Sequence, residues 1–445
     1  MKMPAVSLAV LVLGGIISVP ALAQTRQAPA AQPQTPQPLS LNEAEQIAVR
    51  NHPQIQAAVN LAAASQAQVT QARSAYYPLV YGSLTGAKAE NESRIAAGGL
   101  NSPRIFDKYS NGLVVDQLVT DFGRTHELVK SSNRHAQAER ENVVTTRENV
   151  LLQVDQSYFA VLRDQAVLKV AEQTVQERQL VSDQVTALEK NKIKSGLDVS
   201  FANVNLAQAQ LLLIQAQNNL QASFAQLSAA LGYADQRTFQ LSEEPLPPAP
   251  PSDIAALIQE ALRDRPEMIA QRLDVESAQS YATAERDLWF PTLSAAGAAG
   301  LTPVAGLNQG TSTLAPRYAA AGFNLNVPIF NGHLFGALRT EASQRAQAQN
   351  QYLRDLQDRI VRDVRTAWLN ANSAFQRLSV TEQLLDQANM ALDLAQSRYQ
   401  LGLSSIIELS QAQLNQTQAQ IDQASAKYDY AAQMSALNYQ LGALR

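Results

Sequence analysis

Histidines and cysteines are the side chains best suited to hold a transition metal or to move a proton near neutral pH. The chain has no cysteine, and its histidines are scattered along the sequence: His52, His126, His135 and His333. None belongs to a His-Glu-x-x-His motif, and neither a serine elbow nor a phosphate-binding glycine loop occurs. The sequence therefore predicts no catalytic residue, no metal site and no cofactor, and it argues against an enzyme.

The charge of the chain excludes a further class of partner. Only 17% of its 445 residues are charged, and the formal net charge is −4. Proteins that bind nucleic acid usually carry a concentrated basic patch, so no nucleic-acid partner is expected. Long stretches are dominated by alanine and glutamine, which favours a mainly helical protein.

The first residues have the features of a secretory signal peptide, predicted at 1–23. Lys2 precedes an apolar run at 5–19, and Ala21-Leu22-Ala23 provides small residues for cleavage. A membrane anchor is the alternative, but the run is short for a span, and no uninterrupted apolar run of 18 residues follows it. Residues 24–39 are rich in proline, glutamine and alanine and predict a disordered arm.

Two parts of the sequence repeat each other in the same order. AYYPLVYGSL at 75–84 resembles LWFPTLSAAG at 288–297, because each places two aromatic residues and a proline after an Ala/Gln-rich run. KSGLDVS at 194–200 likewise resembles QLGLSSI at 400–406. Several such matches in register predict a tandem repeat.

The predicted domains follow from this repeat. Repeat 1 covers residues 40–241, repeat 2 covers residues 254–445, and the proline-rich segment 242–253 links them. In each repeat a helix of roughly 35 residues begins at Leu41 or Ser252 and ends at the aromatic-proline sequence, since proline stops a helix. A helical run of about 70 residues comes later, followed by a break at Gly196 or Gly402 and a returning helix.

The long helices carry a seven-residue period that is typical of coiled-coil packing. In the first returning helix, leucines recur every seven residues and form a seam of large side chains: Leu206, Leu213, Leu220 and Leu227. Three positions after each of them lies a small side chain, which forms a second seam: Ala209, Ala216, Ser223 and Ala230. An ordinary helical bundle would show the same seams. Length favours the coiled-coil reading, because about 70 residues extend roughly 100 Å, more than a compact domain needs.

Between the helices lie four predicted strands, at about 76–90, 104–120, 289–304 and 315–329. In the last of them Phe323 and Leu325 alternate with Asn324 and Asn326. Asp116 would be costly in lipid, so its side of the second strand is expected to face inward. Aromatic residues at strand ends suit a membrane-interface girdle: Tyr76, Tyr77, Tyr81, Tyr109, Trp289, Phe290 and Tyr318. A soluble β-sandwich is the alternative.

Four strands cannot close a barrel with a usable lumen, and an open sheet edge in lipid leaves unpaired backbone groups. If these strands lie in a membrane, several chains must therefore share one barrel. Three chains provide 12 strands, within the usual range of about 8 to 26. A polar inner face then implies a water-filled duct.

The order of these parts resembles the TolC family of outer-membrane channel proteins from about Ser40 onward. The resemblance implies a homotrimer with a 12-stranded transmembrane β-barrel, four strands per subunit, continued by a long periplasmic α-helical barrel. It implies an outer-membrane channel of a tripartite efflux or type I secretion system. Its partners would be outer-membrane lipid, a periplasmic membrane-fusion adaptor, and an inner-membrane pump or ABC secretion ATPase.

The same resemblance implies roles for the helix tips. The Gly-Leu pairs that adaptors contact in the family map to Gly196-Leu197 and Gly402-Leu403, although both glycines could serve only as turn residues. Glu408 follows the second tip at a position where the family narrows its periplasmic entrance with acidic side chains. Three copies would form a ring that favours cations, whereas a solvated surface glutamate is the alternative.

A second hypothesis is a non-channel periplasmic coiled-coil adaptor or structural envelope protein, since long paired helices suit both. The placement of two strand segments in each repeat favours the channel. The cargo stays open between drugs, metabolites and proteins, because an outer duct discriminates little.

Overall fold

The computed structural model describes residues 38–87, 95–97, 100–102, 108–301 and 317–444. The predicted signal peptide at 1–23 and residues 24–37 of the predicted arm lie outside this part of the chain. The last two arm residues do not fit the prediction of disorder. Pro38–Leu39 (β1) pairs in parallel with Gln240–Leu241 (β6), and Leu39 is buried.

The helix predicted at the start of each repeat is two helices in the structure. In repeat 1 these are α1 (Leu41–Asn51) and α2 (Pro53–Arg73), and in repeat 2 they are α5 (Ile254–Asp264) and α6 (Pro266–Arg286). Proline disfavours helical geometry at the residue before it, and His52 and Arg265 are accordingly extended, with ψ angles of 123° and 128°. Each proline then begins the second helix, where its missing N–H is not needed.

Short 3₁₀ turns, η1 (Ser74–Tyr76) and η2 (Asp287–Trp289), end α2 and α6 two residues before Pro78 and Pro291. The strands begin directly after these prolines. The aromatic-proline sequence therefore marks the change from helix to strand in both repeats.

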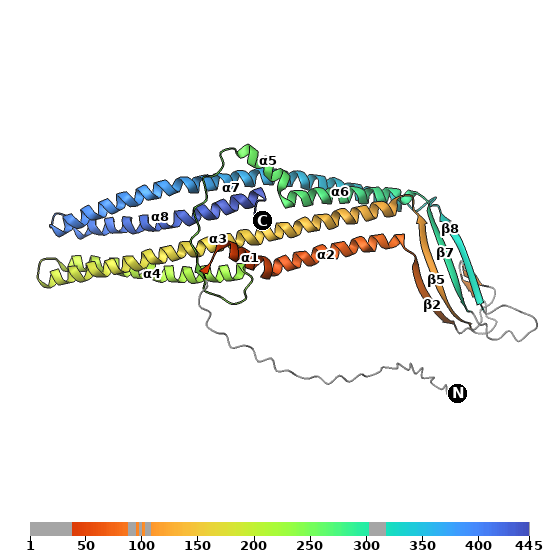
Figure 1. Ribbon diagram of the computed structural model, residues 1–445, viewed down its shortest axis with the longest axis horizontal. Helices are drawn as coiled ribbons and strands as arrows, with labels where there is room; N and C mark the ends of the chain where they lie inside the picture. The colour runs from red at the N-terminus through yellow and green to blue at the C-terminus, as the bar shows by residue number, and fades with distance from the viewer. Residues whose placement is uncertain (1–37, 88–94, 98–99, 103–107, 302–316, 445) are drawn as a thin grey trace, which may run out of the picture. The chain divides into compact units, whose positions relative to one another are not determined.

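The long helices are α3 (Arg124–Lys190) and α7 (Leu334–Gln400), each of 67 residues. At a rise of about 1.5 Å per residue, each extends roughly 100 Å. They return as α4 (Gly196–Ala230) and α8 (Ile406–Leu441). Two helical hairpins result, α3/α4 and α7/α8, and they contact each other mainly through α3 and α8 (Figure 1). The predicted small seam of α4 is buried: Ala209, Ala216, Ser223 and Ala230.

By length and composition alone, α4 is apolar enough to cross a membrane, and it is the one helix of the described residues with that property. The sequence prediction of no such helix rested on uninterrupted apolar runs, which the glutamines and asparagines of α4 break. Although α4 pairs with α3 in a hairpin, only 11% of its apolar stretch is buried, so packing within one chain does not account for this composition.

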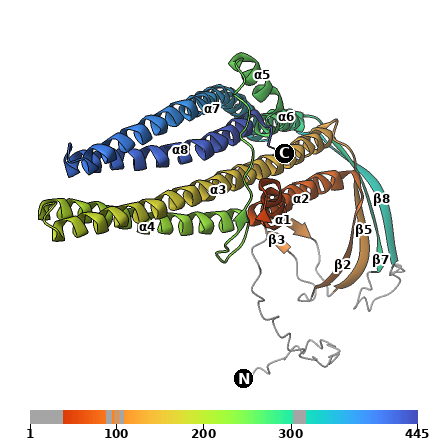
Figure 2. The ribbon, with the colours of Figure 1, turned by 60° about the vertical axis from the view of Figure 1, so that its left-hand side comes forward.

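Four strands form one antiparallel sheet in the order β2-β5-β7-β8 (Figure 2). They are β2 (Leu79–Ala87), β5 (Lys108–Thr120), β7 (Thr292–Leu301) and β8 (Arg317–Asn326). The two repeats meet at the central pair β5–β7, and β2 and β8 are the edges. The sequence did not predict a further small antiparallel pair, β3 (Ile95–Ala97) with β4 (Leu100–Ser102). It belongs to the chain segment that connects β2 to β5.

The predicted linker 242–253 is bound closely to the helices. Tyr158 donates hydrogen bonds to the carbonyls of Leu39 (3.0 Å) and Ser242 (2.7 Å), and Trp368 Nε1 donates to the carbonyl of Pro251 at 2.7 Å. Tyr430 donates to the carbonyl of Pro248. Since proline offers an acceptor but no donor, donor side chains are the natural partners of such a segment.

Candidate functional site

The two faces of the four-stranded sheet differ in chemistry. The pairing register and the alternation along each strand place one set of apolar residues on the same face: Val80, Leu84, Leu113, Val115, Phe323 and Leu325. All are exposed, and Phe323 retains 79% of its accessible surface. A soluble sheet would cover such a face, so it needs an apolar neighbour.

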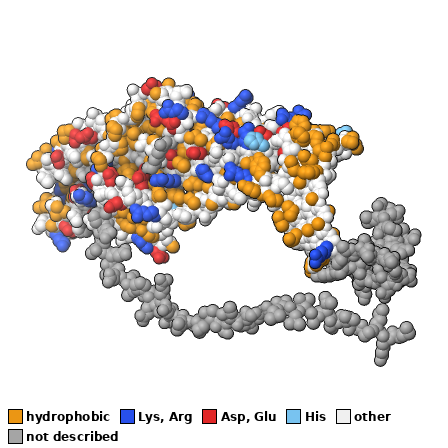
Figure 3. All heavy atoms as spheres, turned by 45° about the vertical axis from the view of Figure 1, so that its right-hand side comes forward, with side chains coloured by type: hydrophobic (Ala, Val, Ile, Leu, Met, Phe, Trp, Pro, Cys, Tyr) orange, Lys and Arg blue, Asp and Glu red, His pale blue; other side chains and the backbone are white. Residues whose placement is uncertain are grey.

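The opposite face carries mostly small and polar side chains, together with Leu79 and Val114. It includes Ser83, Asp116, Ser294, Asn324 and Asn326, and Tyr81 donates a hydrogen bond to Asp116 Oδ2 at 3.2 Å. On the side shown in Figure 3, the strands carry mainly hydrophobic and uncharged groups, whereas most charged side chains lie over the helices. A sheet with one apolar and one polar face is suited to separate lipid from water.

Four of the predicted interface aromatics are exposed where the strands begin: Tyr76, Tyr77, Trp289 and Phe290. Tyr81 and Tyr318 instead share the polar face with Asp116, so their placement does not fit a lipid-facing girdle. The side chain of Tyr109 lies outside the described residues. Sequence reasoning missed Ile329 and Phe330, which are 90% and 81% exposed just beyond β8. Phe330 directly follows the predicted strand 315–329, so its aromatic side chain was the available signal.

At the helix tips, the structure contradicts one residue correspondence that the sequence repeat predicted. Ser195 and Ser405 precede α4 and α8 as N-caps, and the positive-φ residues three positions before them are Lys192 (φ 60°) and Gly402 (φ 74°). Gly196 is the first residue of α4 and is not among the positive-φ residues, so the prediction that it forms the break is wrong. The structural counterpart of Gly402 is Lys192. The side chains of Leu197 and Leu403 are exposed, at 65% and 68%.

Glu408 lies in the first turn of α8 and is paired within its own subunit. Its Oε1 is 3.0 Å from Arg398 Nε near the end of α7, and both side chains are about half exposed. Its counterpart Asp198 instead accepts a hydrogen bond from Ser195 Oγ at 2.8 Å and completes a capping box. Arg398 would therefore offset part of the negative charge of a Glu408 ring, a partner that sequence reasoning did not include.

Three polar contacts fasten the two hairpins to each other in the half of the helices nearest the tips. Lys194 Nζ lies 3.8 Å from the ring centre of Tyr399, and Asn205 Nδ2 donates to Ser410 Oγ at 2.7 Å. Arg178 donates to the carbonyl of Gln413 at 2.9 Å and to Thr417 Oγ1 at 3.0 Å.

Arg178 is buried, and burial lowers the pKa of its guanidinium below the usual range. Hydrogen bonds inside a packed interface are costly to lose without replacement. A movement of one hairpin away from the other at the tips would have to break these contacts.

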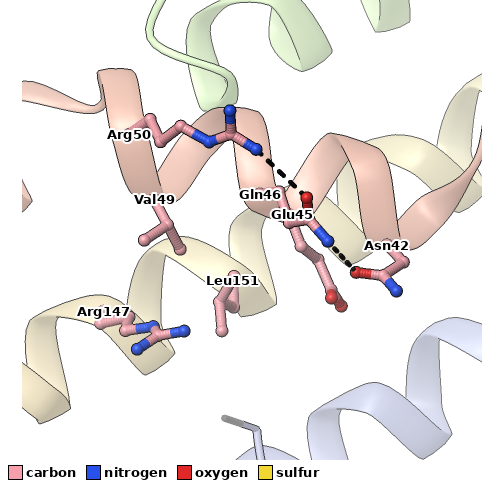
Figure 4. Close-up of a pocket in the computed structure, with 7 residues that line it drawn as sticks. All are labelled: Asn42, Glu45, Gln46, Val49, Arg50, Arg147 and Leu151. Atoms are coloured by element: carbon pink, nitrogen blue, oxygen red, sulfur yellow. Dashed lines mark hydrogen bonds between the residues drawn. The ribbon is translucent and has the colours of Figure 1, made fainter.

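A cavity of about 260 Å³ lies between α1 and α3 (Figure 4) and is lined by Asn42, Glu45, Gln46, Val49, Arg50, Arg147 and Leu151. Along α1, Gln46 donates to Asn42 Oδ1 at 3.0 Å, and Arg50 donates to Gln46 Oε1 at 3.2 Å. Glu45 also shares a hydrogen bond with Asp155 of α3, whose side chain is buried against Ser435 of α8.

Burial raises the pKa of Asp155 to about 7. A hydrogen bond from Ser435 opposes the rise, and the neighbouring Glu45 carboxyl adds to it. Glu244 and Arg147 act on the pKa of Glu45 in opposite directions. The pair therefore holds a proton at neutral pH that an exposed pair would have lost.

We expect this pair to make folding stability depend on pH. The folded state binds the Asp155 proton more tightly than the unfolded chain, so the stabilisation is complete below about pH 4 and is lost as pH rises to about 7. Asp155→Asn should raise the unfolding free energy above pH 7 by on the order of 2–4 kcal/mol and change it little at pH 4. Thermal unfolding in mild detergent at both pH values measures this. An equal effect at both values would contradict a role for the proton.

Within the described residues no group of three histidine, cysteine, aspartate or glutamate side chains could hold a metal ion. Two of the described histidines have local roles. His52 Nδ1 accepts a hydrogen bond from the Gln54 amide and so caps α2, and His135 Nδ1 is 3.0 Å from Asp274 Oδ1.

Comparison with known proteins adds the following. A family model described as "Outer membrane efflux protein" matches residues 45–233 and 257–443. The chain is 26% identical over 394 residues to outer membrane protein TolC of Vibrio cholerae, with 82% of each chain covered. It is 27% identical over 374 residues to the probable efflux pump outer membrane protein TtgC of Pseudomonas putida, covering 81% of this chain and 73% of TtgC. The solved structure of the outer-membrane channel OprN matches with a TM-score of 0.79 at 19% identity, covering 90% and 89% of the two chains.

Proposed function

Because the chain belongs to the family of outer membrane efflux proteins, we propose that three copies of it form one passive exit duct from the periplasm to the exterior. The sequence-based prediction of this family, and of a mainly α fold built as a tandem repeat, is confirmed. Members of the family are outer-membrane channel proteins that work in efflux. A channel function is consistent with the lack of a catalytic motif in the sequence.

The observation that carries the proposal is the two-faced sheet with two open edges. The exposed apolar face, with Phe323 and Leu325, fits lipid, and the face with Asp116 and Asn324 fits a water-filled lumen. The backbone groups at the free edges of β2 and β8 need partners in a membrane. Pairing β8 of one copy with β2 of the next satisfies them, and three copies give a barrel of about 12 strands.

The helical hairpins extend this duct into the periplasm. Each copy contributes α3/α4 and α7/α8, so three copies supply four helices each to one tunnel wall. The exposed leucines at the tips, Leu197 and Leu403, together with Gly196 and Gly402, are the proposed contacts for a periplasmic adaptor. The adaptor would connect the duct to an inner-membrane pump or to a secretion ATPase.

The duct itself is tested by purifying the full mature chain in mild detergent and adding it to a planar bilayer. We expect a trimer by mass measurement and stable single-channel currents. A monomer that passes no current would contradict the proposal. Recovery in the soluble periplasmic fraction without detergent would favour the non-channel spacer instead.

We further propose that the periplasmic entrance opens when the α7/α8 hairpin moves outward from α3/α4. The contacts between the hairpins support this arrangement, because the contacts nearest the tips are single polar contacts, whereas the ion pair of Arg163 with Asp429 (3.7 Å) joins α3 and α8 farther from the tips. Lys194 with Tyr399 and Asn205 with Ser410 are the first that must separate. Arg178, deeper between the helices, keeps the hairpins attached.

Two substitutions at the entrance should shift ion selectivity in opposite directions. Glu408→Ala removes the proposed negative ring, so cation preference should fall, whereas Arg398→Ala removes the cation 3.0 Å from Glu408, so the preference should rise. Reversal potentials under a salt gradient measure both, and the difference should shrink at high salt. Unchanged ion selectivity in Glu408→Ala would contradict the proposed ring of Glu408 side chains.

A further inference from the structure

A row of four residues crosses the polar face of the sheet, one from each strand. Ser83 of β2 is opposite Gly112 of β5, Gly112 is opposite Gly300 of β7, and Gly300 is opposite Tyr318 of β8. Directly opposite residues share a face in an antiparallel sheet. The row therefore places one large aromatic side chain beside two residues that have no side chain.

Tyr318 fills the space that the two glycines leave. A Cβ atom added at Gly300 would lie 2.6 Å from Tyr318 Oη, and one added at Gly112 would overlap the same hydroxyl. The side chain thus reaches from its own strand across β7 to β5 and lies along the wall. It retains 38% of its accessible surface, so part of the ring is open to the space above the sheet.

In the adjacent row of this face, Ala298 and Ala320 are small, and the one large ring, Tyr81, is held by its hydrogen bond to Asp116. Gly322 lies one row further along, and a Cβ added there would meet nothing within 4 Å. The free space above the polar face at this row therefore depends on whether the Tyr318 ring lies along the sheet or points away from it.

We propose that Tyr318 sets the width of the channel lumen at this row, and that Gly112 is the residue that lets its ring lie flat. The inference rests on the proposed function, since the polar face is the lumen only in the assembled barrel. In a trimer, three rings at one level face the same opening. Each ring that stands up narrows the path of ions and cargo.

Gly112→Ala is the decisive variant, because the added methyl group competes mainly with the flexible end of a side chain. It also comes within 2.8 Å of the Ala299 carbonyl, so the strands must separate by a few tenths of an ångström. Gly300 is less useful, because its added Cβ would overlap the main-chain carbonyl of Asn111. Gly322→Ala is the matched control, with the same methyl group on the same face and no ring to displace.

Single-channel conductance of the full-length trimer provides the test. Gly112→Ala should lower conductance below both wild type and Gly322→Ala, and the double variant Gly112→Ala/Tyr318→Ala should recover it. Equal conductance in Gly112→Ala and Gly322→Ala, or no recovery in the double variant, would overturn the proposal. If the wild-type chain passes no current, this result contradicts the proposed channel function itself and is distinct from a failure of the role of Tyr318.

A second measurement covers the case in which Gly112→Ala does not assemble. The chain has no cysteine, so Tyr318→Cys and Phe323→Cys each introduce a single thiol. A charged, membrane-impermeant thiol reagent should reduce the current of Tyr318→Cys and leave that of Phe323→Cys unchanged, because the two residues are on opposite faces of β8. Equal effects, or no effect at Tyr318→Cys, would overturn the assignment.

Discussion

Oxidation of the double variant Asn205→Cys/Ser410→Cys is expected to stop export almost completely, and a reducing agent should restore it. Asn205 Nδ2 lies 2.7 Å from Ser410 Oγ, so the two side chains are already in contact between α4 and α8. A disulfide at this place would prevent the α7/α8 hairpin from separating from α3/α4 at the tips. The absence of native cysteine means that no other disulfide can form within the chain.

A disulfide at the other end of the long helices is the matched control. Ser131 Oγ and Ser277 Oγ are 3.1 Å apart, between α3 and α6, a few turns from the strands. Oxidised Ser131→Cys/Ser277→Cys should export like wild type, because the proposed opening does not separate these helices. Export by the oxidised Asn205→Cys/Ser410→Cys variant, with the crosslink complete on a non-reducing gel, would place the gate elsewhere.

A charge on the apolar face of β8 should prevent membrane assembly, whereas the same charge one residue away should be tolerated. Ala321 shares its face with Phe323, and the adjacent Ala320 shares its face with Asn324. An arginine that faces lipid near the middle of a transmembrane strand costs about 2–4 kcal/mol, and each trimer would contain three. Ala321→Arg should therefore yield little trimer in the outer membrane.

Ala320→Arg is the control for this result, because it introduces the same side chain into the same strand. Its guanidinium would point into water, so the trimer should form, and its main effect should be a lower cation preference. Heat-resistant trimer on a gel and currents in a planar bilayer measure both variants. Equal loss of trimer in both would show that the two faces of the sheet are not lipid and lumen.

The sequence predicts the fold where one physical rule acts alone. Pro78 and Pro291 mark the change from helix to strand, and the predicted helical runs of about 70 residues correspond to the 67 residues of α3 and of α7. Pro53 and Pro266 lie inside the helix that the sequence predicts at the start of each repeat, and their local effect was not predicted. Each forces the residue before it out of helical geometry, so one expected helix is two.

The site was less predictable, because its geometry depends on contacts between distant residues. A glycine in each tip motif suggested equivalent turns, yet the backbone places Lys192 rather than Gly196 opposite Gly402. The pairing of Glu408 with Arg398 depends on how α7 and α8 meet across the turn. Tyr318 was predicted from its place near a strand end, and only the register across three strands shows which face it occupies.

The central pair β5–β7 joins the second sheet strand of repeat 1 to the first sheet strand of repeat 2 within a single chain. In the proposed assembly, β8 pairs with β2 of a neighbouring copy as β5 pairs with β7 within one chain. Around the barrel, pairs between repeats of one chain therefore alternate with pairs between separate chains. A half-length ancestor with one such unit could have closed the same wall as a ring of six identical copies. Fusion of two units would then have freed the halves to diverge, which lets one hairpin of each pair specialise in movement while the other stays still.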